Sequence, residues 1–361
     1  PTTKSDKRID LAGVVLLSAA TACMIFFTDF GGRNDYGWGA PLTWLFGAGM
    51  LLAAVAFVLV ERKAEDPIIP LSLFKNPIFI NSTAIGFTLG VAMFAALAFV
   101  PTFLQMSSGT SAAVSGLLML PMMVGMMGTS IWSGLAITKS GKYKAYPIAG
   151  SAVVIAAMLW MTTLEAATPI WVICAQLFLF GAGLGLIMQV VVLVVQNSVP
   201  VDQIGTATSS NNYFREVGAA LGVAIFGAMF TSRLSESLTD VFTGAGASPE
   251  AAANATSTLE PAAMSQLPEQ VQDGIVTAYA DSLAPVFWYL VPFLVIALVL
   301  AITMKQIPLS DVAGMVARGE AIGGEEAVRL EAEREAAQAG RKDPGASKDP
   351  NDDAGDLVDA G

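Results

Sequence analysis

The fold of this chain is decided by one uncharged stretch, PIWVICAQLFLFGAGLGLIMQVVVLVV, at residues 169–195. A helix that crosses a bilayer needs roughly 20 mostly apolar residues to span about 30 Å of hydrocarbon, and this stretch is longer than that. The whole chain agrees, because 54% of its 361 residues are hydrophobic and only 14% are charged. A soluble globular protein has about 25% charged residues. The sequence therefore predicts a membrane protein.

Eight segments, this one included, are apolar enough to be spanning helices. They are residues 10–29, 43–60, 79–105, 114–138, 146–164, 169–195, 206–232 and 284–304. The seventh has a polar first half, TATSSNNYFRE, and only a short apolar second half at 217–232. We therefore predict an all-α, polytopic membrane protein with eight transmembrane helices.

The basic residues predict how these helices are oriented, because lysine and arginine favour the cytoplasmic ends of spans. Ten of them fall on one side: Lys4, Lys7, Arg8, Arg62, Lys63, Lys75, Lys139, Lys142, Lys144 and Lys305. The opposite side collects only Arg33 and Arg233. Both termini are therefore expected in the cytoplasm, which agrees with an even number of spans.

The chain contains no histidine, which excludes several kinds of site. His-ligated metal centres, Ser-His-Asp triads and Cys-His pairs all require an imidazole. We therefore predict no catalytic residue, no metal site and no bound cofactor. No glycine-rich phosphate loop followed by Lys-Ser/Thr is present either, so an ATP-driven pump is not supported. Cys23 and Cys174 lie inside apolar runs and are interpreted as packing residues.

The net charge of −11 comes largely from one predicted external loop and from the tail after residue 308. This acidity belongs to appendages, and nothing in it indicates a nucleic-acid partner. A secondary transporter is the favoured class. A membrane enzyme or assembly subunit would need a cluster of catalytic groups, and a channel would need a charged ring or a filter-like loop, which the sequence lacks.

Pairs of glycines four residues apart recur inside the predicted spans. The pairs are Gly86 with Gly90, Gly181 with Gly185, and Gly218 with Gly222. Glycines at this spacing share a helix face and allow a neighbouring backbone to approach closely. Two interpretations stay open. The pairs are static packing contacts, or they form smooth seams along which helices slide during transport, with GAGLG at 181–185 the favoured place.

Polar side chains inside spans are costly and therefore mark candidate functional positions. The candidate substrate-binding residues are Gln105, Gln176, Gln189 and Asn212. Gln189 lies deepest, where it either bonds a neighbouring helix or contacts substrate in a cavity. The methionine-rich run LLMLPMMVGMMG at 117–128 either lines an adaptable apolar pocket or is ordinary membrane filler.

Two charges stand at the start of the apolar part of the seventh span, in NNYFREVGAALGVAIFG at 211–227. Either Arg215 anchors the helix at the membrane interface, or Arg215 and Glu216 form pairs across the bundle mouth and gate it. Asn211 precedes Arg215 by four residues and Asn212 precedes Glu216 by four, so each charge has an amide on its own helix face.

Four passages together carry a resemblance to a known family. Three are KRIDLAGVVLLS at 7–18, ERKAEDPIIPLSLFKNPIF at 61–79 and QNSVPVDQIGTATSSNNYFREVGAALGVAIFG at 196–227. The fourth is the loop GLAITKSGKYKAYPIAG at 134–150. They resemble the fourteen-helix drug:proton antiporters of the major facilitator superfamily, the EmrB/QacA type. In the loop, the residues that match the superfamily's glycine and basic positions are Gly134, Lys139, Gly141 and Lys142, with Thr138 where the Asp would be.

The resemblance implies that the chain is the C-terminal portion of such a transporter. It divides the chain into a cytoplasmic leading segment at 1–9, a linker hairpin and its loop at 10–78, a six-helix bundle at 79–304 with an extracytoplasmic loop at 233–283, and an acidic cytoplasmic tail at 305–361. A conformational or gating role is implied for the loop residues and for Arg215, Glu216, Gly218 and Gly222.

The resemblance also implies partners and an activity. The partners are a small-molecule substrate, the lipid bilayer and a missing N-terminal six-helix bundle of the same protein. The activity is export of drugs or other lipophilic molecules, driven by the proton gradient across the plasma membrane, expected to be the bacterial inner membrane. Export of one specific metabolite is the alternative. No Asp or Glu in the deep parts of the eight spans is identified as a proton carrier.

Overall fold

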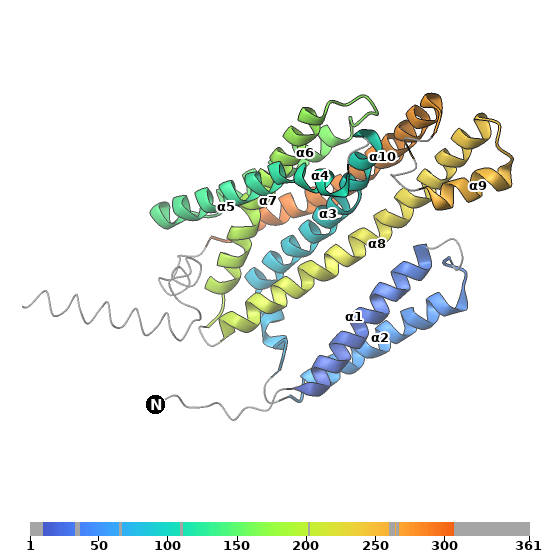
Figure 1. Cartoon of the computed structure of the whole chain (residues 1–361). Coiled ribbons are helices and arrows are strands. Elements are labelled where there is room, and N and C mark those ends of the chain that lie inside the picture. The colour runs from blue at the N-terminus through green and yellow to red at the C-terminus, as the bar shows by residue number, and fades with distance from the viewer. Residues whose placement is uncertain are drawn as a thin grey trace, which may run out of the picture.

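The computed structural model describes residues 10–32, 37–64, 67–108, 111–200, 203–259, 264 and 267–306, and in these ranges it is helical throughout, without strands. The α-helices, shown in Figure 1, are α1 (Leu11–Gly32), α2 (Pro41–Glu61), α3 (Pro77–Ser108), α4 (Ala112–Leu117), α5 (Leu120–Ser140), α6 (Ala145–Met161), α7 (Ile170–Asn197), α8 (Ile204–Gly244), α9 (Pro249–Thr258) and α10 (Glu269–Thr303). A short 3-10 helix, η1 (Leu71–Lys75), precedes α3. The all-α prediction is confirmed. The leading segment 1–9 and the tail from residue 307 lie outside the described residues.

Seven segments of the described chain are long and apolar enough to cross a membrane. They are α1, α2, α3, the α4–α5 segment at Ala113–Ile137, α7, α8 and α10. The predicted span at 146–164 corresponds to α6, an apolar helix of 17 residues that is shorter than the others. A count of eight therefore depends on α6, whose 17 residues are about the minimum for a helix that crosses without much tilt.

Proline has two different effects in these helices. Pro101 lies inside α3 and Pro292 inside α10. The predicted span at 114–138 is instead divided, because α4 ends at Leu117 and Pro121 occupies the first turn of α5. Proline has no backbone N–H to donate and is therefore tolerated at the start of a helix. Pro121 consequently begins a helix and does not kink one.

The extracytoplasmic loop predicted at 233–283 contains long helical extensions. Helix α8 continues to Gly244 and α10 already begins at Glu269. Leu234, Leu238 and Phe242 are spaced four apart on one face of α8, and all three are buried in the main hydrophobic core. This stripe stabilises the extension, so both helices continue beyond the predicted spans into the loop region.

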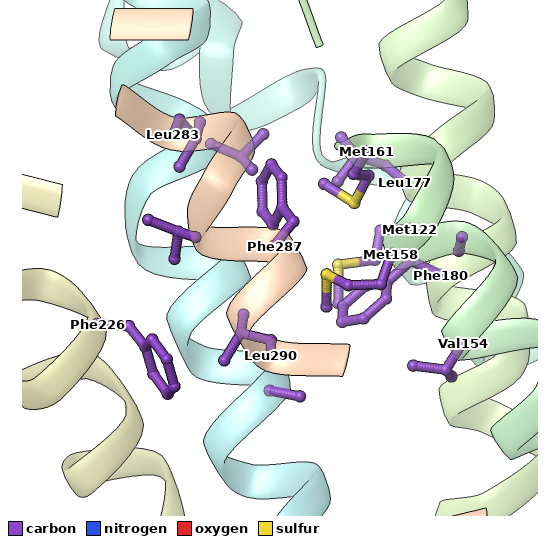
Figure 2. Close-up of a cluster of buried hydrophobic side chains, with 14 of the residues drawn as sticks. Met122, Val154, Met158, Met161, Leu177, Phe180, Phe226, Leu283, Phe287 and Leu290 are labelled. Atoms are coloured by element: carbon purple, nitrogen blue, oxygen red, sulfur yellow. The ribbon is translucent and has the colours of Figure 1, made fainter. Parts of the chain in front are cut away.

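The bundle and the hairpin occupy different places in the molecule. Helices α1 and α2 pack against each other and lie beside α8, as Figure 1 shows. Helices α3, α5, α6, α7, α8 and α10 form the main body, with α10 packed against α3, α6 and α8. The interior of this body is filled mainly by leucine, isoleucine, valine and alanine, with methionines and aromatic rings among them. Figure 2 shows part of this cluster, including Phe287 of α10, Met158 and Met161 of α6, and Phe180 of α7.

The methionine-rich run does not act as one unit. Met122 is buried in this core, whereas Met123 and Met127 are exposed on another face of α5. The run thus contributes both core packing and outward-facing apolar surface.

Candidate functional site

The contact between α3 and α8 is built on glycines from both helices. A Cβ atom at Gly90 would collide with the carbonyl oxygen of Arg215. A Cβ atom at Gly218 would collide with the carbonyl oxygen of Phe87, and one at Gly222 with that of Val91. Three glycines of two separately predicted pairs therefore form one seam, in which the two backbones touch directly.

A second seam of the same kind joins α7 to α5. Added Cβ atoms at Gly181 and Gly185 would collide with the carbonyl oxygens of Met122 and Met126. The hydroxyl of Thr129 on α5 donates a hydrogen bond of 2.7 Å to the carbonyl of Ala182. The GAGLG stretch thus holds α7 tightly against α5 in this structure.

A buried polar side chain, Asn211, lies at the end of the α3–α8 seam that is nearest the N-terminus of α8. Asn211 is 2% exposed, and its Nδ2 donates a hydrogen bond of 3.3 Å to the hydroxyl of Thr83 on α3. Arg215 pairs with the adjacent Glu216 at 3.0 Å, and the two side chains are 20% and 54% exposed. The Nε atom of Arg215 is buried and has no hydrogen-bond partner. Arg215 therefore lies at the edge of the bundle, partly inside it.

Next to these residues, α1, α3 and α8 line an open cavity of about 860 Å³, within the usual size range of small-molecule sites. Its lining residues are Ile25, Thr28, Asp29, Phe94, Phe99, Glu216, Ala219, Ala220, Val223, Ala224, Gly227, Ala228, Thr231 and Ser232. Small side chains on α8 make room for the cavity, and phenyl rings from α3 form an apolar wall. Two carboxyl groups and three hydroxyls give it a polar component.

One hydrogen bond joins α1 to α8 next to the cavity. The hydroxyl oxygens of Thr21 and Tyr213 are 2.7 Å apart. Because the Thr21 hydroxyl donates to the carbonyl of Leu17 at 2.8 Å, Tyr213 is the donor in this pair. The residues one and two turns after Thr21, namely Ile25, Thr28 and Asp29, line the cavity.

The predicted substrate-binding residues are distributed over several places, and none of the four lines this cavity. Gln105 donates to the carbonyl of Pro101 in its own helix at 3.3 Å. Gln176 is fully buried and donates to the carbonyl of Trp160 on α6 at 3.0 Å. Asn212 is half-buried on α8. Gln189 is half-buried on α7 and faces α5, where a Cβ at Gly134 would lie 3.9 Å from its Cγ.

The predicted loop residues have structural partners in the segment between α5 and α6. Gly141 has a φ of 66°, a left-handed conformation that suits glycine, and its N–H donates to the carbonyl of Ile137. Lys142 is exposed, and the side chain of Lys139 lies outside the described residues. The hydroxyl of the fully buried Tyr143 donates to the carbonyl of Lys305 at 3.0 Å, which fastens this loop to the end of α10.

The sequence profile of the Major Facilitator Superfamily matches residues 11–223, more than half of the chain. The chain belongs to the major facilitator superfamily. Superfamily membership and the seven apolar helices together make it a multi-pass membrane protein of a transporter family, and the superfamily is not one of enzymes.

Relatives within the superfamily include transporters and resistance proteins. An uncharacterized MFS-type transporter of Mycobacterium tuberculosis is 38% identical over 84% of this chain and 43% of its own length. Multidrug transporter protein MdtP of Bacillus subtilis is 33% identical over 84% of this chain and 59% of its own length. A tetracycline resistance determinant of Streptomyces rimosus is 32% identical over 63% of this chain and 65% of its own length. The chain thus spans about half the length of the first two relatives.

The cavity residues of this superfamily member were largely missed by sequence reasoning. Asp29, the last residue of a predicted span, and the cavity-lining Phe94 and Phe99 were not predicted as site residues. The usable signal is on α8, where Glu216, Ala220 and Ala224 follow one another at intervals of four. That spacing marks one helix face with small side chains, which is compatible with a hollow beside it.

Proposed function

We propose that this chain is the C-terminal portion of a fourteen-helix drug:proton antiporter. In this proposal α1 and α2 are the linker hairpin, and the six helices of the bundle are α3, α5, α6, α7, α8 and α10, with α6 counted as a span. The N-terminal six-helix bundle is a further part of the same protein. Both ends of this chain face the cytoplasm of a bacterial inner membrane.

The observation that carries the proposal is the likeness of 84% of this chain to a protein named as a multidrug transporter. The likeness to a tetracycline resistance determinant supports export as the direction of transport. Drugs or other lipophilic small molecules are the proposed substrates, moved by alternating access and driven by the proton gradient.

The cavity beside α8 is proposed as one place where substrate is held. Phe94 and Phe99 supply apolar contact area, and Asp29 supplies negative charge for a cationic substrate, whereas the charge of Glu216 is paired with Arg215. The α3–α8 seam keeps these two helices together, so they are proposed to move as one unit. Arg215 and Glu216 at its lower end are proposed to close the bundle mouth.

The test is efflux of a panel of fluorescent lipophilic cations from cells that express the full gene. Ala224→Leu should lower efflux several-fold, because the larger side chain projects into the cavity. Ala156→Leu makes the same change on an exposed face of α6 and should leave efflux unchanged. Both variants are compared at equal protein levels in the membrane. An unmodified protein that changes the accumulation of no compound in the panel would overturn the multidrug proposal.

A further inference from the structure

Glu61 is a buried carboxyl group at the end of the linker hairpin. It is the last residue of α2 and is only 3% exposed. One of its oxygens, Oε1, accepts a hydrogen bond of 2.5 Å from the backbone N–H of Ile69. The other oxygen, Oε2, is buried and has no hydrogen-bond partner. A buried polar atom left in this state is costly unless something else satisfies it.

Asp10 presents a matching carboxyl group at the start of α1. Its Oδ1 accepts a hydrogen bond of 2.9 Å from the N–H of Gly13 and so caps the first turn. Its Oδ2 is also buried without a partner. A Cβ atom at Gly13 would touch both Asp10 Oδ2 and the side chain of Ile68, so Asp10 faces the loop that Glu61 holds, where the two carboxyl groups act on each other electrostatically. Each therefore offers the other an unsatisfied oxygen.

No cation balances the two groups within the described part of the chain. Arg62 and Lys63 directly follow Glu61, but neither forms an ion pair with either carboxyl group. The elements packed against the pair are the start of α1, the end of α2 and the loop at 67–70, whose described residues are Pro67, Ile68, Ile69 and Pro70. This loop contributes backbone N–H groups and apolar side chains, and no charge.

Two ionised carboxylates in contact repel each other strongly when they are shielded from water. A single proton removes the conflict, because the protonated group then donates an O–H···O bond to the ionised one. That bond would satisfy both orphaned oxygens at once. We infer that Asp10 and Glu61 together form a proton-binding site that holds one proton between them and so fastens the start of α1 to the end of α2.

The bound proton also has an effect on the loop that leads into the bundle. Glu61 holds Ile69, which is buried, and Ile69 lies just before η1 and α3. When the proton is released to water, the O–H···O bond is lost and the two negative charges push the carboxyl groups apart. The grip of Glu61 on the Ile69 amide then weakens. The site is independent of whether the chain transports drugs.

Hydrogen–deuterium exchange at the Ile69 amide in the full-length protein in lipid nanodiscs tests this site. Protection factors are measured over a range of pH, after correction for the intrinsic exchange rate. In the unmodified protein, protection should be greatest at acid pH and should fall roughly fivefold to tenfold as the shared proton is lost. In Glu61→Gln an amide N–H replaces the proton, so protection should stay flat with pH. Asp10→Asn should give the same flat profile if Glu61→Gln does not fold.

Asp281→Asn changes an exposed carboxyl group on α10 and should keep the unmodified profile. The infrared C=O stretching band of a protonated carboxyl group should be present in the unmodified protein at neutral pH and weaker in Glu61→Gln. A flat protection profile in the unmodified protein would overturn the proposal. Protection that depends on sodium concentration at fixed pH would also overturn it, since the pair would then hold a metal cation.

Discussion

At the scale of single residues, glycines do different work although they look alike in sequence. Gly86 and Gly218 both belong to predicted pairs four residues apart. A Cβ at Gly218 would collide with the carbonyl oxygen of Phe87, whereas one at Gly86 would lie 3.5 Å from Asn211 Nδ2, an ordinary contact. Only Gly218 must be a glycine for the seam to form.

The substitution Gly218→Ala should therefore destabilise the protein by roughly 1–3 kcal/mol, because the α3 backbone must move away from α8. The measurement is the free energy of unfolding of the full-length protein in mixed micelles. Gly86→Ala on the facing helix is the matched control and should cost little. Equal losses for the two variants would contradict the close-packing account of the seam.

Arg215 shows what residue spacing can and cannot predict. The spacing of four placed Asn211 and Asn212 beside the charges, but Asn211 bonds Thr83 on α3 and Arg215 pairs with Glu216. Same-helix neighbours can be read from periodicity. The hydrogen-bond partner of a side chain depends on which helix packs against it, and a single sequence does not show which helix that is.

At the scale of elements, the helices were predicted well and their ends less well. Helix α8 was expected at 206–232 and runs over Ile204–Gly244. The charges of Arg233, Glu236 and Asp240 ended the apolar stretch in the sequence, although Leu234, Leu238 and Phe242 continue the buried face between them. A hydropathy criterion ends a predicted helix where charged residues appear, even when these lie only on its exposed face. The actual helix continues for as long as its other face stays buried.

The cavity could not be predicted from hydropathy either, because it depends on how distant helices pack. Its volume depends on the distance between α1 and α8, two helices almost 200 positions apart in the chain, and that distance is set by tertiary contacts. Small residues on α8 indicate either that a neighbouring helix packs closely against them or that a cavity lies beside them. They do not distinguish a seam, as at Gly218, from a hollow, as at Ala224.

The hydrogen bond between Thr21 and Tyr213 should couple the hairpin to the bundle, and a double-mutant cycle can measure that coupling. Thr21→Val and Tyr213→Phe should each lower the free energy of unfolding by roughly 0.5–1.5 kcal/mol. The double variant should lose about as much as either single one, because both changes remove the same bond. Fully additive losses would show that the two hydroxyl groups are not coupled.

At the scale of the whole molecule, the distribution of basic residues predicts which ends of the helices face the cytoplasm. Lys142, between α5 and α6, and Thr243, near the end of α8, should lie on opposite sides of the membrane, and both are exposed. Cysteine labelling in intact cells with a membrane-impermeant maleimide tests this after Cys23 and Cys174 are replaced.

Thr243→Cys should be labelled from outside, and Lys142→Cys only after the cells are permeabilised. The reverse pattern would invert the topology, and labelling of both from outside would contradict an odd number of crossings between them. This experiment also bears on α6: when α7 and α8 both cross, the two sites lie on opposite sides only if α6 crosses as well.

The length of α8 has a mechanical consequence. Its 41 residues at 1.5 Å each give a rod of about 60 Å, roughly twice the thickness of the hydrocarbon layer. In the proposed topology, the centre of this rod lies near the membrane midplane. A tilt of about 10° about that point would carry its two ends about 5 Å in opposite directions. Because α8 is joined to α3 by the seam and to α1 by the bond from Tyr213 to Thr21, these helices would move with it. One small rotation would then open the protein toward one side of the membrane and close it toward the other.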